Sequence, residues 1–188
     1  MRRLLYVCAS LAATLALYAG QTAYIGQSPL HSAAPAAAGA APSTNGGDYK
    51  IVKVVDGDTV DVEKNGQKMR LRLIGLDTPE IVDLRKPVQC FAKEASDKAR
   101  QILTGQTVRL EMDPTQGELD KYGRTLAYIF VPANSTIEGI LFNEYMIAEG
   151  FGHEYTYRLP YKYMEEFKAA EKSARENKKG LWADGVCG

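Results

Sequence analysis

The stretch VVDGDTVDVEKNGQKMRLRLIGLDTPE, residues 54–80, decides the fold of this chain. Apolar and polar residues alternate over residues 59–63 and again over residues 67–76, which is the period of a half-buried strand. Asn65-Gly66 stands between the two runs, and this pair favours a tight hairpin because such a turn requires positive φ. The stretch therefore predicts two antiparallel strands joined by a two-residue turn.

The segments on either side extend this hairpin into a larger fold. The β-branched run from Tyr49 to Val55 predicts a strand before it. Apolar periodicity and stop signals after it predict, in order, a helix over 87–103, strands starting at Thr107 and Arg124, and helices over 137–149 and 160–179. Five short strands with a helix before the fourth fit a Greek-key barrel of the oligonucleotide/oligosaccharide-binding type. We therefore expect an α+β chain, mainly β barrel, with five barrel strands and three helices.

The first 48 residues differ from the rest of the chain in composition. Two arginines precede a long apolar run without acidic residues, so residues 1–26 are predicted to be a signal peptide. The alternative is an uncleaved membrane anchor through residues 4–25, because the run approaches the length that spans a bilayer. Residues 27–48 are rich in Ala, Pro, Gly and Ser and predict a flexible linker. The folded domain is expected over 49–188, outside the cytoplasm, either secreted or anchored.

The composition excludes several classes of chemistry. The formal charge of the chain is +0, so any binding of nucleic acid must rest on a local site and not on an overall basic field. Only two histidines occur, and His31 lies in the predicted linker, which leaves His153. A Ser-His-Asp or Cys-His mechanism, or zinc held by histidines, is therefore poorly supported. Catalysis would have to use carboxylates, arginines, tyrosines and a hard cation.

Two of the three cysteines belong to the predicted domain. Cys8 lies in the predicted signal peptide or anchor, and Cys90 and Cys187 remain as an even pair. Because disulfides persist in exported proteins, we predict a bridge between Cys90 and Cys187 that closes nearly the whole domain into one loop. The alternative is two free thiols.

The hairpin brings two carboxylates toward the same end of the sheet. Asp58 opens its first strand and Asp77 closes its second, so the two can meet across the turn. Each motif taken alone is better explained by a simple turn. Two converging carboxylates would repel each other, and a Ca²⁺ or Mg²⁺ bound through oxygens, including the Thr78 carbonyl, would relieve this. Arg72 and Arg124 would then offer two guanidiniums suited to bidentate contact with phosphate.

Three stretches carry a resemblance to a known family. VVDGDTV, RLRLIGLDTPE and DKYGRTLAYI resemble the signature stretches of the staphylococcal nuclease (thermonuclease) family, in the family's order and at similar spacing. The similarity extends over residues 49–183. It implies a calcium-dependent phosphodiesterase on a five-stranded barrel with helices.

The resemblance also implies roles for individual residues, taken over position by position. The metal would be held by Asp58, Asp77 and the Thr78 carbonyl; the catalytic residues would be Arg72, Glu80 and Arg124; substrate would contact Lys121, Tyr122, Tyr155 and Tyr157. Core packing is an equal alternative for Tyr157. The sequence departs from the family over residues 81–90, where IVDLRKPVQC is more apolar than the family's lysine-rich loop.

The sequence thus predicts an exported, calcium-dependent nuclease that hydrolyses the phosphodiester bonds of DNA and RNA with little sequence specificity. Its partners would be nucleic acid substrates, with no protein partner indicated and a monomer expected. The main alternative is a catalytically inactive barrel that binds single-stranded nucleic acid. A surface module for oligosaccharide or peptide would leave the paired arginines without a role.

Overall fold

The structure is a computed structural model that describes residues 48–81, 88–133 and 139–187. The predicted signal or anchor segment and residues 27–47 of the predicted linker lie outside these ranges. Asp48, the last residue of that predicted linker, already begins the first strand, where it pairs with Arg109.

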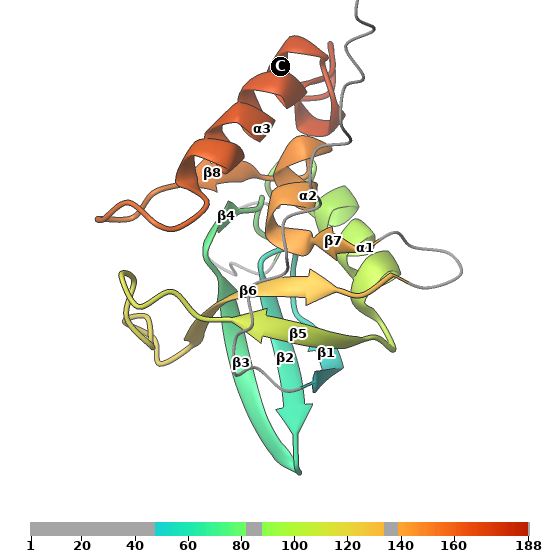
Figure 1. The fold of residues 1–188 in the computed structure, drawn as a ribbon. Helices are drawn as coiled ribbons and strands as arrows, with labels where there is room; N and C mark the ends of the chain where they lie inside the picture. The colour runs from blue at the N-terminus through green and yellow to red at the C-terminus, as the bar shows by residue number, and fades with distance from the viewer. Residues whose placement is uncertain (1–47, 82–87, 134–138, 188) are drawn as a thin grey trace, which may run out of the picture. The chain divides into compact units, whose positions relative to one another are not determined.

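The described strands form a closed barrel, as the sequence predicts (Figure 1). The main sheet has the order β3-β2-β1-β5-β6-β7, and a further pairing between β3 and β6 closes it. Its strands are β1 (Asp48–Val54), β2 (Thr59–Lys64), β3 (Gln67–Leu73), β5 (Thr107–Glu111), β6 (Thr125–Val131) and the short β7 (Ile140–Leu141). Two further short strands, β4 (Gly75–Asp77) and β8 (His153–Tyr155), pair with each other beside the barrel.

The predicted hairpin forms between β2 and β3. Asn65 and Gly66 adopt φ of 51° and 77°, the left-handed conformation that a tight hairpin turn requires. The register runs from Lys64 opposite Gln67 to Thr59 opposite Arg72. The strand after this turn is shorter than the sequence predicts, because the run to residue 76 is divided between β3 and β4.

Gly75 causes this division. Its φ is +74°, and a Cβ at this position would lie within 2.7 Å of ring atoms of Tyr161 and Phe167. The chain can turn here and leave the barrel only because the residue has no side chain. The turn directs Asp77 away from the barrel and into pairing with His153 of β8.

The described residues contain three α-helices, as expected, and each begins later than predicted. They are α1 (Ala92–Leu103), α2 (Phe142–Ala148) and α3 (Met164–Glu176), followed by a short 3-10 turn η1 (Gly180–Trp182). Competing contacts delay two of these starts. Ile140 pairs with Val131 as a strand, and the Lys162 N–H donates to Asp113 Oδ2 at 2.8 Å. The beginnings of the helices predicted at residues 87 and 137 lie outside the described residues.

The barrel interior and the faces of the helices share one apolar core. Asn143 of α2 is a fully buried polar residue within it, and it connects the helix to β6 and to the turn between β3 and β4. Its Oδ1 accepts from the Ile129 N–H at 3.0 Å, and its Nδ2 donates to the Ile74 carbonyl at 2.9 Å. Among the residues described, no helix combines the length and apolar character needed to cross a membrane.

Candidate active site

Closure of the barrel brings the two predicted arginines to one place. Arg72 lies on β3 opposite Thr59 of β2, and parallel pairing places Leu71 opposite Thr125 at the start of β6. Arg124, which directly precedes that strand, therefore arrives beside Arg72, and its Nη1 lies 3.3 Å from Thr59 Oγ1. Since 65 residues separate Arg124 from Thr59, this proximity depends on the closed barrel.

Asp58 and Asp77 meet across the hairpin through Arg72. One Arg72 nitrogen, Nη1, pairs with Asp58 Oδ2, and the other, Nη2, lies 2.7 Å from Asp77 Oδ1. Asp58 is only 1% exposed, and it also accepts from the Thr78 N–H at 3.0 Å and the Thr59 hydroxyl at 2.9 Å. Burial would lower the pKa of Arg72, but Asp58 and Asp77 outweigh it and raise that pKa. The guanidinium is thus permanently charged and held between two carboxylates.

A close backbone approach explains the Asp-Gly-Asp motif. A Cβ on Gly57 would lie 2.7 Å from both Cγ2 and Oγ1 of Thr78. The missing side chain lets the β1–β2 turn lie directly against the residue after β4. This packing brings the Thr78 backbone to Asp58.

Negative charge exceeds positive charge around Arg72. Burial, together with the charges of Asp58 and Glu80, raises the pKa of Asp56 to about 7. Partial burial of its carboxyl and the charge of Asp58 raise the pKa of Glu80 above its ordinary range, against the opposing effect of Arg72. Sequence patterns indicate only a turn at Asp56, yet this residue is 7% exposed, and its Oδ1 accepts from the Asp58 N–H at 3.3 Å. The only sequence feature that places Asp56 near the site is that it lies two residues before Asp58.

The donor chemistry of this cluster fits a hard cation. No three His, Cys, Asp or Glu side chains converge into a complete metal site within the described ranges. The predicted ligands, the carboxylates of Asp58 and Asp77 with the Thr78 carbonyl, are all oxygens, which Ca²⁺ and Mg²⁺ prefer and which water can complete. Burial raises the pKa of Asp56 most, and the charges of Asp58 and Glu80 raise it further; a divalent cation would offset this contribution of the negative charges.

A cleft of about 560 Å³ extends from the arginines. Its walls are the segment 112–124, between β5 and β6, and the segment 156–162, between β8 and α3. In Figure 1 both segments project toward the left of the view. Gln116 Nε2 joins the walls by donating to the carbonyls of Leu159 and Pro160 at 3.2 and 3.1 Å. The cleft is lined by Arg72, Asp77 and Arg124. It is also lined by all four predicted substrate residues, which are Lys121, Tyr122, Tyr155 and Tyr157.

The tyrosines of the cleft present their rings to solvent. Tyr122, Tyr155 and Tyr157 are 71%, 45% and 56% exposed. The rings of Tyr155 and Tyr157 lie 6.3 Å apart, and Lys121 Nζ lies 4.9 Å from the centre of the Tyr122 ring. Tyr157 is therefore not a core residue in this structure. Exposed aromatic faces beside two guanidiniums are suited to bases and phosphates.

Comparison of the sequence with known proteins places the chain in a family. The family model described as "Staphylococcal nuclease homologue" matches residues 70–184. The chain belongs to the staphylococcal nuclease family. The Thermonuclease of Staphylococcus hyicus is 45% identical over 136 residues, which are 72% of this chain and 76% of that protein. The Thermonuclease of Staphylococcus intermedius is 39% identical, over 73% of this chain and 77% of that protein. The Micrococcal nuclease of Shigella flexneri is 35% identical, over 72% of this chain and 73% of that protein.

Within this member of the staphylococcal nuclease family, the predicted site residues occupy two connected regions. Arg72 contacts both Asp58 and Asp77, and the Thr78 N–H donates to Asp58. Arg124 is connected to this group through the Thr59 hydroxyl, which contacts both Arg124 and Asp58. Glu80 is exposed beside them, and the four substrate residues line the cleft. Val82 and Leu84, part of the predicted departure from the family, lie outside the described residues. The structure also contains the disulfide between Cys90 and Cys187, with 5.8 Å between their Cα atoms.

Proposed function

We propose that this chain is an exported, calcium-dependent nuclease that hydrolyses DNA and RNA by water attack on the phosphodiester. Family membership makes the chain a hydrolase of the endonuclease type, and the proposal adds its metal, its substrates and its location. One observation carries it: Arg72 is held between Asp58 and Asp77 beside Arg124, at the end of a cleft lined by tyrosines. By resemblance to the family, cleavage of the 5′ P–O bond would leave 3′-phosphates.

The arginines would stabilise the transition state. During hydrolysis, negative charge grows on the equatorial oxygens of the phosphate, and preorganised cations aimed there accelerate the reaction. Arg72 is held by two carboxylates, and the Arg124 Nε is held by Asp120 Oδ2 at 2.7 Å. Because both side chains are already oriented, little reorganisation is needed when the phosphate binds.

Glu80 would orient the attacking water and accept its proton. The raised pKa of its carboxyl brings it toward the range in which a general base works well near neutral pH. A calcium ion bound by Asp58, Asp77 and the Thr78 carbonyl would add a fixed positive charge beside the phosphate. These roles need no histidine.

The tyrosines would bind bases without discriminating strongly among them. Every base has a flat face that stacks on an aromatic ring, and each stack contributes about 1–3 kcal/mol. Tyr122, Tyr155 and Tyr157 are exposed along the cleft and offer such faces. This supports activity on both DNA and RNA. The rival function, binding of single strands without hydrolysis, uses the same cleft but leaves Glu80 without a purpose.

The deciding experiment is a nuclease assay on plasmid DNA and on RNA, with calcium and then with a calcium chelator. We expect cleavage of both substrates that stops with the chelator. We expect Glu80→Gln to reduce kcat by about 10²- to 10⁴-fold with an unchanged circular dichroism spectrum. Binding without cleavage by the unaltered chain would favour the rival function. Equal cleavage in chelator would remove calcium from the proposal.

Calcium binding can also be measured without activity. A ligand that binds only the folded state raises the melting temperature by mass action. We expect calcium to raise the Tm of the unaltered chain and to have little effect on Asp77→Asn. Asp61→Asn is the matched control, because Asp61 pairs with Arg70 in the same hairpin, away from the cluster. A calcium shift that persists in Asp77→Asn would contradict the assigned ligand.

Export is proposed from the sequence of residues 1–26 and is supported by the Cys90–Cys187 disulfide, since such bridges persist in oxidising compartments. Expression of the full chain in its host, followed by fractionation, tests it. We expect the protein in the medium or on the membrane. Recovery from the cytoplasm alone, with Cys90 and Cys187 as free thiols, would contradict export.

A further inference from the structure

Glu80 is joined to Gln89 by two hydrogen bonds that run in opposite directions. The Glu80 N–H donates to Gln89 Oε1 at 2.8 Å, and the Gln89 N–H donates to the Glu80 carbonyl at 3.3 Å. The two residues are nine positions apart. The backbone that carries the Glu80 carboxyl is therefore attached to the segment leading into α1.

These two hydrogen bonds are weak restraints by themselves. Both Glu80 and Gln89 are exposed, so water competes for the same donors and acceptors. The pair can hold Glu80 in one place only if Gln89 is itself held. The residues that follow Gln89 supply this restraint.

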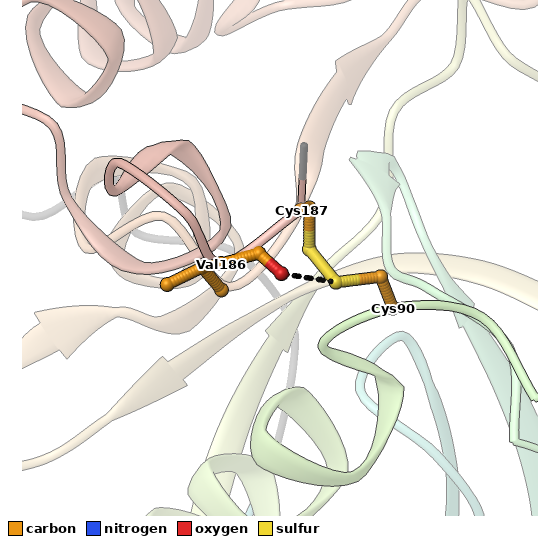
Figure 2. Close-up of a disulfide and its surroundings, with 3 residues drawn as sticks. All are labelled: Cys90, Val186 and Cys187. Atoms are coloured by element: carbon orange, nitrogen blue, oxygen red, sulfur yellow. Dashed lines mark hydrogen bonds between the residues drawn. A yellow bond between two sulfur atoms is a disulfide. The ribbon is translucent and has the colours of Figure 1, made fainter.

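The residue next to Gln89 is covalently attached to the other end of the domain. Figure 2 shows the disulfide between Cys90 and Cys187, together with the Val186 carbonyl oxygen, which lies 3.1 Å from Cys90 Sγ. The bridge connects positions 97 residues apart. It prevents the segment before α1 from moving away from the C-terminal turn.

The next residue, Phe91, is in a conformation that its surroundings must maintain. Its φ is 65°, in the left-handed region, which aromatic residues rarely adopt. Such a conformation persists only where neighbouring contacts determine it. Phe91 stacks on Phe151 with 5.6 Å between ring centres, and the Ala92 N–H donates to the Gln89 carbonyl at 3.2 Å. Residues 89–92 are thus held by a covalent bond, a stacked ring pair and a turn.

We propose that Gln89 is a positioning residue for Glu80, and that the Cys90–Cys187 bridge keeps Gln89 in place, so that turnover depends on the oxidised bridge. The proposal rests on the proposed role of Glu80 as the residue that orients and activates water. Its consequence is a nuclease that is least active where thiols stay reduced, and that reaches full activity once the bridge has formed in an oxidising compartment.

The first test removes the acceptor of the Glu80 N–H. In the full chain, we expect Gln89→Ala to lower kcat by about 10- to 100-fold, because small displacements of a catalytic group have effects of that size. KM should stay within about twofold of its value in the unaltered chain. Hydrogen exchange at the Glu80 amide should become faster. Gln89→Glu keeps an acceptor oxygen and should restore slow exchange and most of kcat. An unchanged kcat in Gln89→Ala would overturn the proposal.

The matched control for Gln89→Ala is Gln101→Ala. Gln101 is an exposed glutamine at the other end of the α1 segment, where its Oε1 accepts from Lys98 Nζ at 3.0 Å. We expect kcat and the Glu80 amide exchange to stay as in the unaltered chain. An equal loss of kcat in both variants would show a general effect on α1 and overturn the assignment to Gln89.

The second test removes the bridge. We expect Cys90→Ser/Cys187→Ser, assayed well below its own Tm, to lose kcat by a factor similar to that of Gln89→Ala. Adding Gln89→Ala to this variant should cost little more, because both changes act through the same contact. A lower Tm with unchanged kcat would mean that the bridge only stabilises the fold, and this would overturn its part of the proposal.

Reduction of the unaltered chain offers the same test without mutation. A dithiol reductant transfers two electrons and two protons to the bridge, giving two thiols and its own cyclic disulfide. We expect kcat to fall on reduction and to recover on reoxidation, while the double Ser variant should not respond. A response of the Ser variant would assign the loss to the reductant and overturn the redox dependence.

Failure of this proposal is distinguishable from failure of the proposed function. If Glu80→Gln abolishes turnover while Gln89→Ala leaves it intact, the function stands and the positioning role falls. If Glu80→Gln turns over normally, the role of Glu80 itself falls, even where Gln89→Ala accelerates exchange at the Glu80 amide.

Discussion

At the scale of single residues, two neighbouring arginines form similar ion pairs, but only one of them belongs to the candidate site. Arg70 and Arg72 lie on the same strand, and each pairs with aspartate. The Arg70 side chain is 52% exposed and pairs with Asp61 on the outer surface, where such a pair contributes little. The Arg72 side chain is 15% exposed and faces the cleft. Burial and position, more than residue type, make Arg72 the functional candidate.

This difference leads to a paired prediction. We expect Arg72→Ala to reduce kcat by about 10²- to 10³-fold, because one preorganised donor to the transition state is lost. Arg70→Ala should change kcat by less than about twofold. Steady-state kinetics on single-stranded DNA measure both effects. Similar kinetics for the two variants would contradict the role assigned to Arg72.

A second prediction concerns the exposed tyrosines. We expect Tyr157→Ala to raise KM for single-stranded DNA by about 5- to 150-fold with little change in kcat, because one stacking contact worth about 1–3 kcal/mol is lost. Tyr157→Phe keeps the ring and serves as the control, with KM near that of the unaltered chain. If Phe and Ala raise KM equally, the hydroxyl and not the ring is what contacts substrate.

At the scale of elements, one buried carboxylate connects the barrel to both walls of the cleft. Asp113 follows β5 and is 3% exposed. Its Oδ1 accepts from the Thr115 N–H and hydroxyl, and its Oδ2 accepts from the Tyr128 hydroxyl of β6 and the Lys162 N–H before α3. Burial would raise the pKa of Asp113, but the donors of Lys162, Thr115 and Tyr128 outweigh it and lower that pKa.

The lowered pKa gives a pH-dependent prediction. A carboxyl whose folded pKa lies below its unfolded value of about 3.9 stabilises the fold fully at higher pH. That stability is lost as pH falls through the folded pKa. We expect Asp113→Asn to lower the free energy of unfolding by about 1.5–3 kcal/mol at pH 7, as charge-assisted hydrogen bonds are lost. Urea denaturation should show this deficit shrinking below about pH 4. A deficit that grows in acid would contradict the sign of the shift.

At the scale of the whole molecule, the Cys90–Cys187 bridge acts on the free energy of the entire domain as well as on Glu80. It joins the start of α1 to the C-terminal turn across 97 residues. A bridge that closes so long a loop restricts the unfolded chain strongly. It is the one covalent contact between distant parts of the chain among the described residues.

We therefore expect Cys90→Ser/Cys187→Ser to lower the free energy of unfolding by about 2–5 kcal/mol. This change in the free energy of unfolding is measured by denaturing three samples: the oxidised unaltered chain, the same chain after reduction, and the double variant. The reduced chain and the double variant should agree closely. A double variant as stable as the oxidised chain would mean that strain in the folded state offsets the bridge.

Much of the fold follows from local sequence. The Asn65-Gly66 turn, the alternation on either side of it and the helical periodicities specify the β2–β3 hairpin and the order of elements, because turn chemistry and amphipathic period act over a few residues. The helix starts did not follow from that pattern. Lys162, for example, continues a helical periodicity, yet its N–H bonds to Asp113, 49 residues away, and the helix begins later.

The sequence by itself determined the hairpin, the barrel class and the residues that resemble a nuclease site. Only the tertiary structure decided which of them touch: Arg72 between Asp58 and Asp77, Arg124 against Thr59, and Glu80 against Gln89. The physical reason is distance along the chain. Propensity and periodicity are local, whereas the site forms where closure of β3 on β6, the turn at Gly75 and the Cys90–Cys187 bond bring remote segments together.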